Sequence, residues 1–209
     1  MKVKLCGFTE IASVQTAIAQ KCDFIGFIFY DKSPRYITLE KAVEISKNIP
    51  KNIARVAVVV DVDFEFLTEI AQKFAPDFFQ FHGKESSDFL KKSRQKFPQI
   101  KIIKAFSIEG EIDLVQVKNF EDCADFFLFD GKNAGSGKKF DWKVLQNFHS
   151  KKDWFLSGGL NAQNIEEALK ANAANMVDIS SGIEKIRGQK SPELIEELMK
   201  KILEQQTVK

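Results

Sequence analysis

Residues 153–182 read DWFLSGGLNAQNIEEALKANAANMVDISSG, and this stretch decides the fold. An apolar run at 153–157 leads into two glycines, an amphipathic stretch over 162–172 and a second apolar run at 176–180. Short apolar runs bounded by turn residues are typical of buried strands, whereas a longer stretch with spaced apolar residues is typical of a helix. The stretch therefore predicts a strand, a helix and a second strand.

The same pattern recurs on both sides of this stretch. We predict strands at 2–6, 23–29, 54–60, 77–81, 100–105, 125–130, 153–157 and 176–180. We predict helices at 10–20, 39–48, 63–74, 86–96, 111–120, 140–149, 162–172 and 192–205, with helix N-caps at Thr9, Thr38, Asp63 and Asn161. Uninterrupted strand–helix units favour a parallel sheet closed into a (β/α)₈ TIM barrel of the α/β class, and we expect residues 1–209 to form a single domain.

Composition narrows the class of protein. The chain is 44% hydrophobic and 29% charged, as expected of a globular protein, and we interpret most of its 20 Phe residues as core. A net charge of +2 without a basic stripe argues against binding to nucleic acid. No run approaches the roughly 18 apolar residues of a membrane span, and the N-terminus lacks the features of a secretory signal. Cys6, Cys22 and Cys123 lack metal-type spacing, so we expect free thiols and a cytoplasmic location.

Small residues follow three predicted strands. They are Ser157-Gly158-Gly159, Ser180-Ser181-Gly182 and Gly135-Ser136-Gly137. Glycine lets backbone N–H groups approach an anion, and TIM barrels commonly bind phosphate after their seventh and eighth strands. A tight turn would explain one such loop equally well, but three on neighbouring strands predict a site for a small phosphorylated ligand. The candidate phosphate contacts are Gly135, Ser136, Gly137, Gly158, Gly159, Ser180, Ser181 and Gly182.

Longer motifs sit at the strand ends in a fixed order. In the first half they are Lys4-Leu5-Cys6-Gly7, Gly26-Phe27-Ile28-Phe29, Ser33-Pro34-Arg35-Tyr36 and Gln80-Phe81-His82-Gly83-Lys84-Glu85. In the second half they are Phe129-Asp130, Gly135-Ser136-Gly137 with Phe140-Asp141-Trp142, Leu156-Ser157-Gly158-Gly159-Leu160 and Val177-Asp178-Ile179-Ser180-Ser181-Gly182-Ile183-Glu184. Over nearly its whole length the sequence resembles the phosphoribosylanthranilate isomerase family.

The resemblance implies an activity and the residues that carry it. The family converts N-(5′-phosphoribosyl)anthranilate to 1-(2-carboxyphenylamino)-1-deoxy-D-ribulose 5-phosphate in tryptophan biosynthesis, by an Amadori rearrangement without metal or organic cofactor. By position, Asp130 is the general acid that protonates the furanose ring oxygen, and Cys6 is the base that removes the proton from C2′. Arg35 is assigned to the anthranilate carboxylate, which a guanidinium can bind through two hydrogen bonds. His82 is expected to line the pocket.

Each of these residues also has a plainer interpretation. Cys6 could be a small apolar residue of a strand, Asp130 a loop cap, Arg35 a solvated loop cation and His82 a neutral packed side chain. Cys22 and Cys123 match no motif and are interpreted as structural.

A supporting ion pair is predicted beneath the base. Strand alternation puts Lys4 and Cys6 on one face, and barrel closure brings the strand of Asp178 and Ser180 next to them. We expect Lys4 to pair with Asp178 inside the barrel, to orient the thiol of Cys6 and to favour its ionisation.

The sequence departs from the family pattern at two places. Gly131 stands where the family usually has a small hydroxyl residue, and residues 185–191 differ from the usual Pro-Gly and Lys-Asp pattern.

Alternative functions remain open. They are a noncatalytic barrel that binds a sugar phosphate or a protein, or an isomerase that also accepts the histidine-pathway aminoaldose. Other phosphate-binding barrels fit less well, because they need different strand-end groups. A monomer and a homodimer both fit the sequence.

Overall fold

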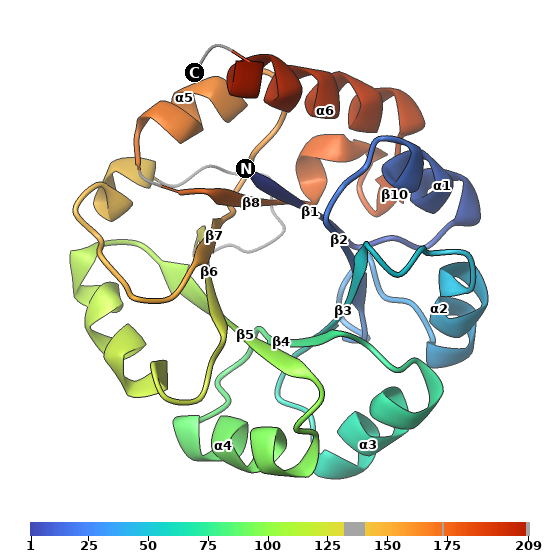
Figure 1. Ribbon diagram of the computed structural model, residues 1–209, viewed down its shortest axis with the longest axis vertical. Coiled ribbons are helices and arrows are strands. Elements are labelled where there is room, and N and C mark those ends of the chain that lie inside the picture. The colour runs from blue at the N-terminus through green and yellow to red at the C-terminus, as the bar shows by residue number, and fades with distance from the viewer. Residues whose placement is uncertain (132–140, 173, 208–209) are drawn as a thin grey trace.

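Eight parallel strands form a closed barrel in sequential order, and β8 pairs with β1 to close it. The computed structural model describes residues 1–131, 141–172 and 174–207. Figure 1 shows the ring of strands surrounded by an outer ring of helices, which confirms the predicted (β/α)₈ barrel. The strands are β1 (Lys2–Cys6), β2 (Phe24–Ile28), β3 (Ala54–Val59), β4 (Phe78–Phe81), β5 (Lys101–Ile108), β6 (Phe126–Gly131), β7 (Trp154–Leu156) and β8 (Met176–Ile179).

The outer ring is less regular than predicted. Its α-helices are α1 (Ile11–Ala19), α2 (Leu39–Ser46), α3 (Phe64–Lys73), α4 (Ser87–Lys96), α5 (Ile165–Lys170) and α6 (Pro192–Thr207). The helix predicted at 111–120 is the 3₁₀ helix η1 (Glu111–Phe120), and within the described part of 140–149 only the short 3₁₀ turn η2 (Trp142–Leu145) forms. In η1, Ile112 and Val115 are exposed while Val117 and Phe120 are buried, so its apolar residues do not share one face.

Two of the four predicted N-caps are confirmed. The side chains of Thr38 and Asp63 accept hydrogen bonds from the backbone N–H three residues later. The prediction of Thr9 is wrong, because the residue at the N-cap of α1 is Glu10. The side chain of Glu10 makes no cap hydrogen bond. Asn161 is also wrong as a helix cap: its side chain accepts from the N–H groups of residues 163 and 164, within a turn that ends before α5.

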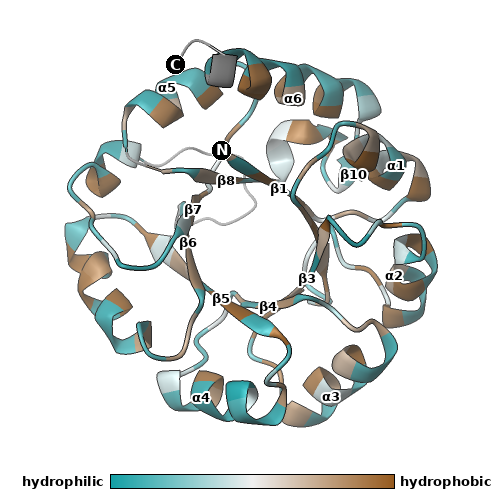
Figure 2. Cartoon of the chain, in the orientation of Figure 1, coloured by the Kyte–Doolittle hydropathy of each residue, from teal (hydrophilic) through white to brown (hydrophobic). Residues whose placement is uncertain are grey.

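Side chains pack in two apolar layers. Residues that point into the barrel form one core, which includes Phe24, Val56, Phe78, Leu128 and Phe155. Alternate residues of the same strands pack outward against the helices in a larger core, and most Phe side chains are buried in one core or the other. Figure 2 shows the surrounding helices banded with hydrophobic and hydrophilic residues, as amphipathic helices over a core require. None of the helices within the described ranges is long and apolar enough to cross a membrane.

The connection from β8 to α6 contains a small hairpin that the sequence pattern did not predict. It starts with the 3₁₀ turn η3 (Ser181–Ile183) and continues as β9 (Glu184–Ile186) and β10 (Gln189–Lys190), which pair antiparallel. The hairpin falls in the stretch that departs from the family pattern. It lies at the end of the barrel where the carboxyl ends of the strands meet.

Candidate active site

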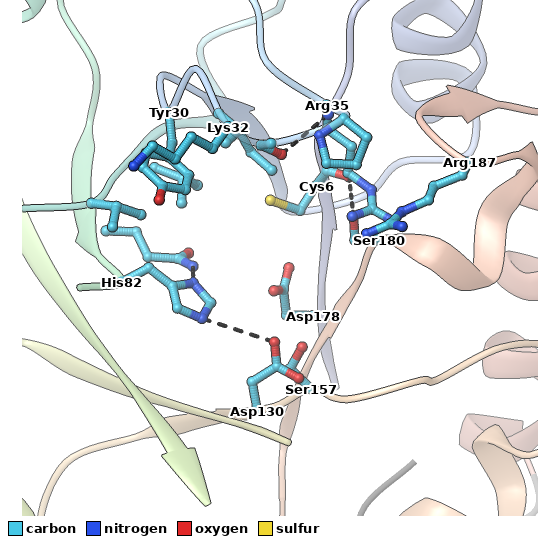
Figure 3. A pocket seen from close by; sticks show the side chains of 16 residues that line it. Cys6, Tyr30, Lys32, Arg35, His82, Asp130, Ser157, Asp178, Ser180 and Arg187 are labelled. Carbon is cyan, nitrogen blue, oxygen red and sulfur yellow. Dashed lines mark hydrogen bonds and ion pairs between the residues drawn. The ribbon is translucent and has the colours of Figure 1, made fainter. Parts of the chain in front are cut away.

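A cavity of about 320 Å³ opens among the loops at the carboxyl ends of the strands. Figure 3 shows its side chains, which come from barrel strands and from the loops that follow them. Six of the predicted site residues line it, namely Cys6, Arg35, His82, Asp130, Asp178 and Ser180. Active sites of TIM barrels lie at this end, so the cavity is the candidate active site.

Cys6 ends β1 with its thiol inside the barrel, where it is 4% exposed. The residue paired with it on β2 is Gly26, which has no side chain to fill the space beside the thiol. A Cβ atom at Gly26 would lie 2.7 Å from Sγ of Cys6. Glycine at this position therefore leaves the thiol room to face the cavity.

We predict that Gly26→Ala lowers kcat about 100-fold, because the added methyl group pushes the thiol away from its position and small misplacements of reacting groups are costly. The matched control is Gly110→Ala, where no atom lies within 4 Å of the added Cβ. Steady-state kinetics of both variants test this. Equal kcat values for the two variants would show that the space beside Cys6 is not needed.

Below the thiol, the predicted pair of Lys4 and Asp178 is present. Lys4 and Asp178 face each other on the neighbouring strands β1 and β8, with Nζ 2.8 Å from Oδ1. Burial raises the pKa of the Cys6 thiol, and Lys4 opposes this rise without cancelling it, so the pKa lies above its ordinary 9.0. Lys4 thus favours the thiolate, as expected, but the apolar surroundings outweigh it.

We predict that the combined replacement Lys4→Met and Asp178→Asn raises the pKa of Cys6 further. Removing both partners avoids an unpaired buried carboxylate, and Lys4 affects the thiol more strongly than Asp178 does. The pH dependence of Cys6 alkylation, followed peptide by peptide with mass spectrometry, should move to higher pH. Lys2→Met, at an exposed position of the same strand, should leave the profile in place. An unchanged pH profile of alkylation in the double variant would show that Lys4 does not influence the ionisation of Cys6.

Asp130 lies on β6 and is 7% exposed. Burial raises its pKa from 3.8 to about 7, and the nearby Asp178 carboxylate adds to the rise. The backbone N–H of Gly131 donates to Oδ1 over 2.8 Å and acts in the opposite direction. Near neutrality a substantial fraction of this carboxyl is therefore protonated, which a general acid requires. The main chain holds the carboxyl in place although Gly131 has no hydroxyl.

His82 follows β4 and lies beside Asp130. Its Nε2 is 3.9 Å from Oδ2 of Asp130, too far for a hydrogen bond, and burial lowers its pKa to about 4. The ring is therefore neutral, and Nε2 of Gln80 lies 3.1 Å from its Nδ1. Within the described residues, Oε1 of Gln80 and Nε2 of His82 are buried without a hydrogen-bond partner. Buried polar atoms are nearly always paired, so these two are candidate ligand contacts.

Arg35 is buried rather than a solvated loop cation, which rules out its plainer interpretation. Its Nε and one terminal nitrogen donate to the two carboxylate oxygens of Glu184 over 2.6 and 2.8 Å. Nζ of Lys190 also donates to Glu184, over 2.6 Å. Burial alone would raise the pKa of Glu184, but these contacts outweigh it and hold the pKa below its ordinary value. A buried, ionised carboxylate thus holds two cations beside the cavity.

The small-residue loops lie at the ends of β7 and β8. Gly158 and Gly159 have φ angles of +91° and +72°, and their N–H groups donate to no other residue that the structure describes. A Cβ atom at Gly182 would collide with the carbonyl oxygen of Leu160, so the two loops are packed tightly together. Of the candidate phosphate contacts, Ser180 alone lines the cavity, and Gly135, Ser136 and Gly137 lie outside the described residues.

Comparison with protein families agrees with this arrangement. Residues 3–201 match the model of the family described as N-(5'phosphoribosyl)anthranilate (PRA) isomerase. The chain belongs to this family.

Full-length relatives share the family name. N-(5'-phosphoribosyl)anthranilate isomerase of Zymomonas mobilis is 37% identical over 207 residues, which cover 97% of this chain and 98% of the relative. The Brucella canis protein of the same name is 38% identical over 203 residues, covering 94% and 91%.

Solved structures of family members are also similar. Phosphoribosyl anthranilate isomerase from Thermotoga maritima superimposes with a TM-score of 0.89 at 32% identity, over 98% of this chain and 99% of that one. Another structure of a phosphoribosyl anthranilate isomerase, in complex with reduced 1-(o-carboxyphenylamino)-1-deoxyribulose 5-phosphate, gives 0.87 at 30% identity, over 98% and 99%. The Thermotoga maritima enzyme is described as dimeric.

For this phosphoribosylanthranilate isomerase family member, sequence reasoning missed several residues around the cavity. Gln80 belongs to the motif that also contains His82, and strand alternation could have predicted that its side chain points into the barrel from β4. Glu184 ends the motif that contains Asp178 and Ser180, but nothing in the sequence indicates that it binds Arg35. Lys190 and Arg187 lie in the unpredicted hairpin, and no sequence signal points to them.

Proposed function

We propose that the chain catalyses the Amadori rearrangement of N-(5′-phosphoribosyl)anthranilate, with Asp130 as general acid and Cys6 as general base. The observation that carries this proposal is the shared cavity: a carboxyl whose pKa is about 7 and a thiol face it from β6 and β1. Two proton-transfer groups from separate strands can act on different atoms of one sugar. The reaction is part of tryptophan biosynthesis.

The first step opens the sugar ring. Asp130 gives its proton to the ring oxygen while the bond from C1′ to that oxygen breaks, and the lone pair of the anthranilate nitrogen forms a C=N bond. The product of this step is a protonated Schiff base with a free hydroxyl at C4′. The neutral His82 beside Asp130 adds no competing positive charge.

The second step moves a proton away from C2′. The Cys6 thiolate takes this proton, the electrons of the C–H bond form a double bond between C1′ and C2′, and the C=N bond returns its electrons to nitrogen. The resulting enol-amine gains a proton at C1′ and loses one from the hydroxyl at C2′, which gives the ketone product. Lys4 supports this step because its charge favours the thiolate.

The substrate has two anionic ends. The N–H groups of Gly158 and Gly159 have no partner among the described residues, and the adjacent loop after β8 is packed against theirs, which supports a phosphate site there. The Arg35 guanidinium lies at the β2 side of the cavity and supports binding of the anthranilate carboxylate.

Turnover of freshly prepared phosphoribosylanthranilate by the purified protein tests the proposed function. We expect rapid loss of substrate fluorescence and formation of the deoxyribulose phosphate, identified by the ketone carbon in its ¹³C NMR spectrum because the two isomers have the same mass. Circular dichroism must show that the same sample is folded. A folded protein that binds inorganic phosphate but leaves the substrate unchanged would favour a noncatalytic barrel instead.

The pH profile provides a second test. Below about pH 7 Asp130 keeps its proton while the Cys6 thiolate fraction grows, so kcat/KM should rise about tenfold per pH unit. Between pH 7 and the higher pKa of Cys6, the gain in thiolate is offset by deprotonation of Asp130, and the profile should be level. Above both pKa values it should fall. A profile that is flat from pH 5 to 7 and falls above 7 would exclude the thiolate as the base.

The thiols also support a cellular location. Cys6, Cys22 and Cys123 are all free. Free thiols persist in a reducing compartment, so we place the enzyme in the cytoplasm.

A further inference from the structure

The hairpin between β8 and α6 is built around the carboxylate of Glu184. Oε1 accepts hydrogen bonds from Nε of Arg35 and Nζ of Lys190, each over 2.6 Å. Oε2 accepts from a terminal nitrogen of Arg35 over 2.8 Å and from the backbone N–H of Gly188 over 3.2 Å. This one buried group therefore ties together the loop after β2, the turn of the hairpin and its second strand.

The turn of the hairpin is also pressed against the loop after β2. Gly188 has a φ of +90°, and a Cβ atom there would collide with the carbonyl oxygen of Pro34. Arg187 directly precedes this constrained glycine, so its backbone position is fixed relative to Arg35.

Arg187 points its side chain at the candidate active site. It lines the cavity, and Figure 3 shows it beside Arg35 and Ser180, away from His82. The side chain is exposed and forms no hydrogen bond or ion pair with any residue of the described ranges. An arginine on a hairpin is usually a solvated surface residue, but this one is held at the rim of a cavity by a buried cluster.

The groups around Arg187 indicate which part of a ligand its guanidinium would contact. Arg35 already uses Nε and one terminal nitrogen for Glu184, so less of its guanidinium is available to a substrate. The connection from β8 to α6 starts on the side of the small-residue loops. There Gly182 packs against Leu160, which follows the small residues after β7. Arg187 lies at the end of this connection next to the loop after β2, because Gly188 is pressed against Pro34. The hydroxyl of Ser180, the candidate phosphate contact on this side, already donates to the carbonyl of Cys6 and accepts from Nζ of Lys190.

We propose that Arg187 is a substrate-binding residue that contacts the aromatic carboxylate of the substrate from a hairpin held in place by the cluster of Glu184, Lys190 and Arg35. The inference rests on the proposed function, because that function supplies the carboxylate. A guanidinium at the rim can bind a carboxylate through two hydrogen bonds.

Kinetics of Arg187→Gln test the proposal, with Lys185→Gln as the matched control. Lys185 is exposed on the same hairpin and does not line the cavity, so both variants lose one positive charge in the same region. We expect KM for phosphoribosylanthranilate to rise about ten-fold in Arg187→Gln with kcat unchanged, since a charge-assisted hydrogen bond is lost in substrate and transition state alike. Lys185→Gln should match the wild type.

A substrate that lacks the aromatic carboxylate tests whether Arg187 contacts that group. With N-(5′-phosphoribosyl)aniline, Arg187→Gln and wild type should have equal KM values. Three results would overturn the proposal: an unchanged KM in Arg187→Gln, an equal rise in both variants, or a rise that persists with the aniline compound.

Binding separates this inference from the proposed function. If the wild type fails to turn over substrate, the proposed reaction fails, but affinity for the reduced product analogue, measured by calorimetry, still tests Arg187. A weaker Kd in Arg187→Gln than in Lys185→Gln would then support the contact, and equal Kd values would refute it.

Discussion

Replacing Cys6 with serine is expected to lower kcat for phosphoribosylanthranilate about a thousand-fold. A serine hydroxyl in the same buried position has almost no ionised form near neutrality, so the proposed base for the C2′ proton is lost. Positioned general bases typically contribute factors of this order. KM should change little, because the substitution alters none of the groups proposed to bind the two anionic ends of the substrate. Stopped-flow or steady-state fluorescence measures both parameters.

The control for this variant is Cys123→Ser. Cys123 is a fully buried thiol far from the cavity lining, and its Sγ already donates to the carbonyl of Phe120, a contact that a hydroxyl can keep. Its kcat should equal that of the wild type. If Cys6→Ser retained activity within ten-fold of Cys123→Ser, another group would have to be the base.

Replacing Asp130 with asparagine is expected to reduce kcat by a similar factor. The amide has the shape of the carboxyl and can still accept the Gly131 N–H, but it has no acidic proton to give to the ring oxygen. Asp77→Asn is the matched control, since Asp77 also accepts a backbone N–H, at the opposite end of the barrel. A substrate analogue whose ring is already open would lose less rate in Asp130→Asn than the natural substrate does.

Stability distinguishes lost chemistry from misfolding in this variant. The pKa of Asp130 is about 7 in the folded protein and lower when unfolded, so the folded state binds the extra proton between these values. The free energy of unfolding therefore falls as pH rises from 3.8 to about 7, and this loss stays constant at higher pH. Asp130→Asn should raise the Tm at pH 8 although it removes activity. A lower Tm would indicate that the carboxylate is mainly structural.

The barrel and the ion pair beneath the base could be predicted because both follow from strand periodicity. Alternation alone puts Lys4 and Cys6 on one face, and closure of the sheet brings Asp178 beside them. The irregular outer ring could not be predicted in the same way. In the 3₁₀ helix η1, the apolar residues Ile112 and Val115 point to solvent, so its sequence spacing was a poor guide to its structure.

The cation cluster was beyond the sequence for a different reason. Arg35 and Glu184 are 149 positions apart and belong to loops whose shape no periodic pattern sets. The same holds for pKa values: a sequence identifies Asp130 as a carboxyl at a strand end, but only the packing around it shows that burial raises its pKa to about 7.

The pairing of Lys4 with Asp178 also has a consequence for synthesis of the chain. These residues are 174 positions apart, on the first and last strands of the barrel, so the surroundings of Cys6 are complete only after β8 has been synthesised. Cys6 is therefore synthesised long before Asp178, which completes its surroundings. Until β8 has been made, β1 is an open edge with the free thiol of Cys6 beside it. Appearance of isomerase activity in a timed translation reaction would therefore report closure of the barrel itself.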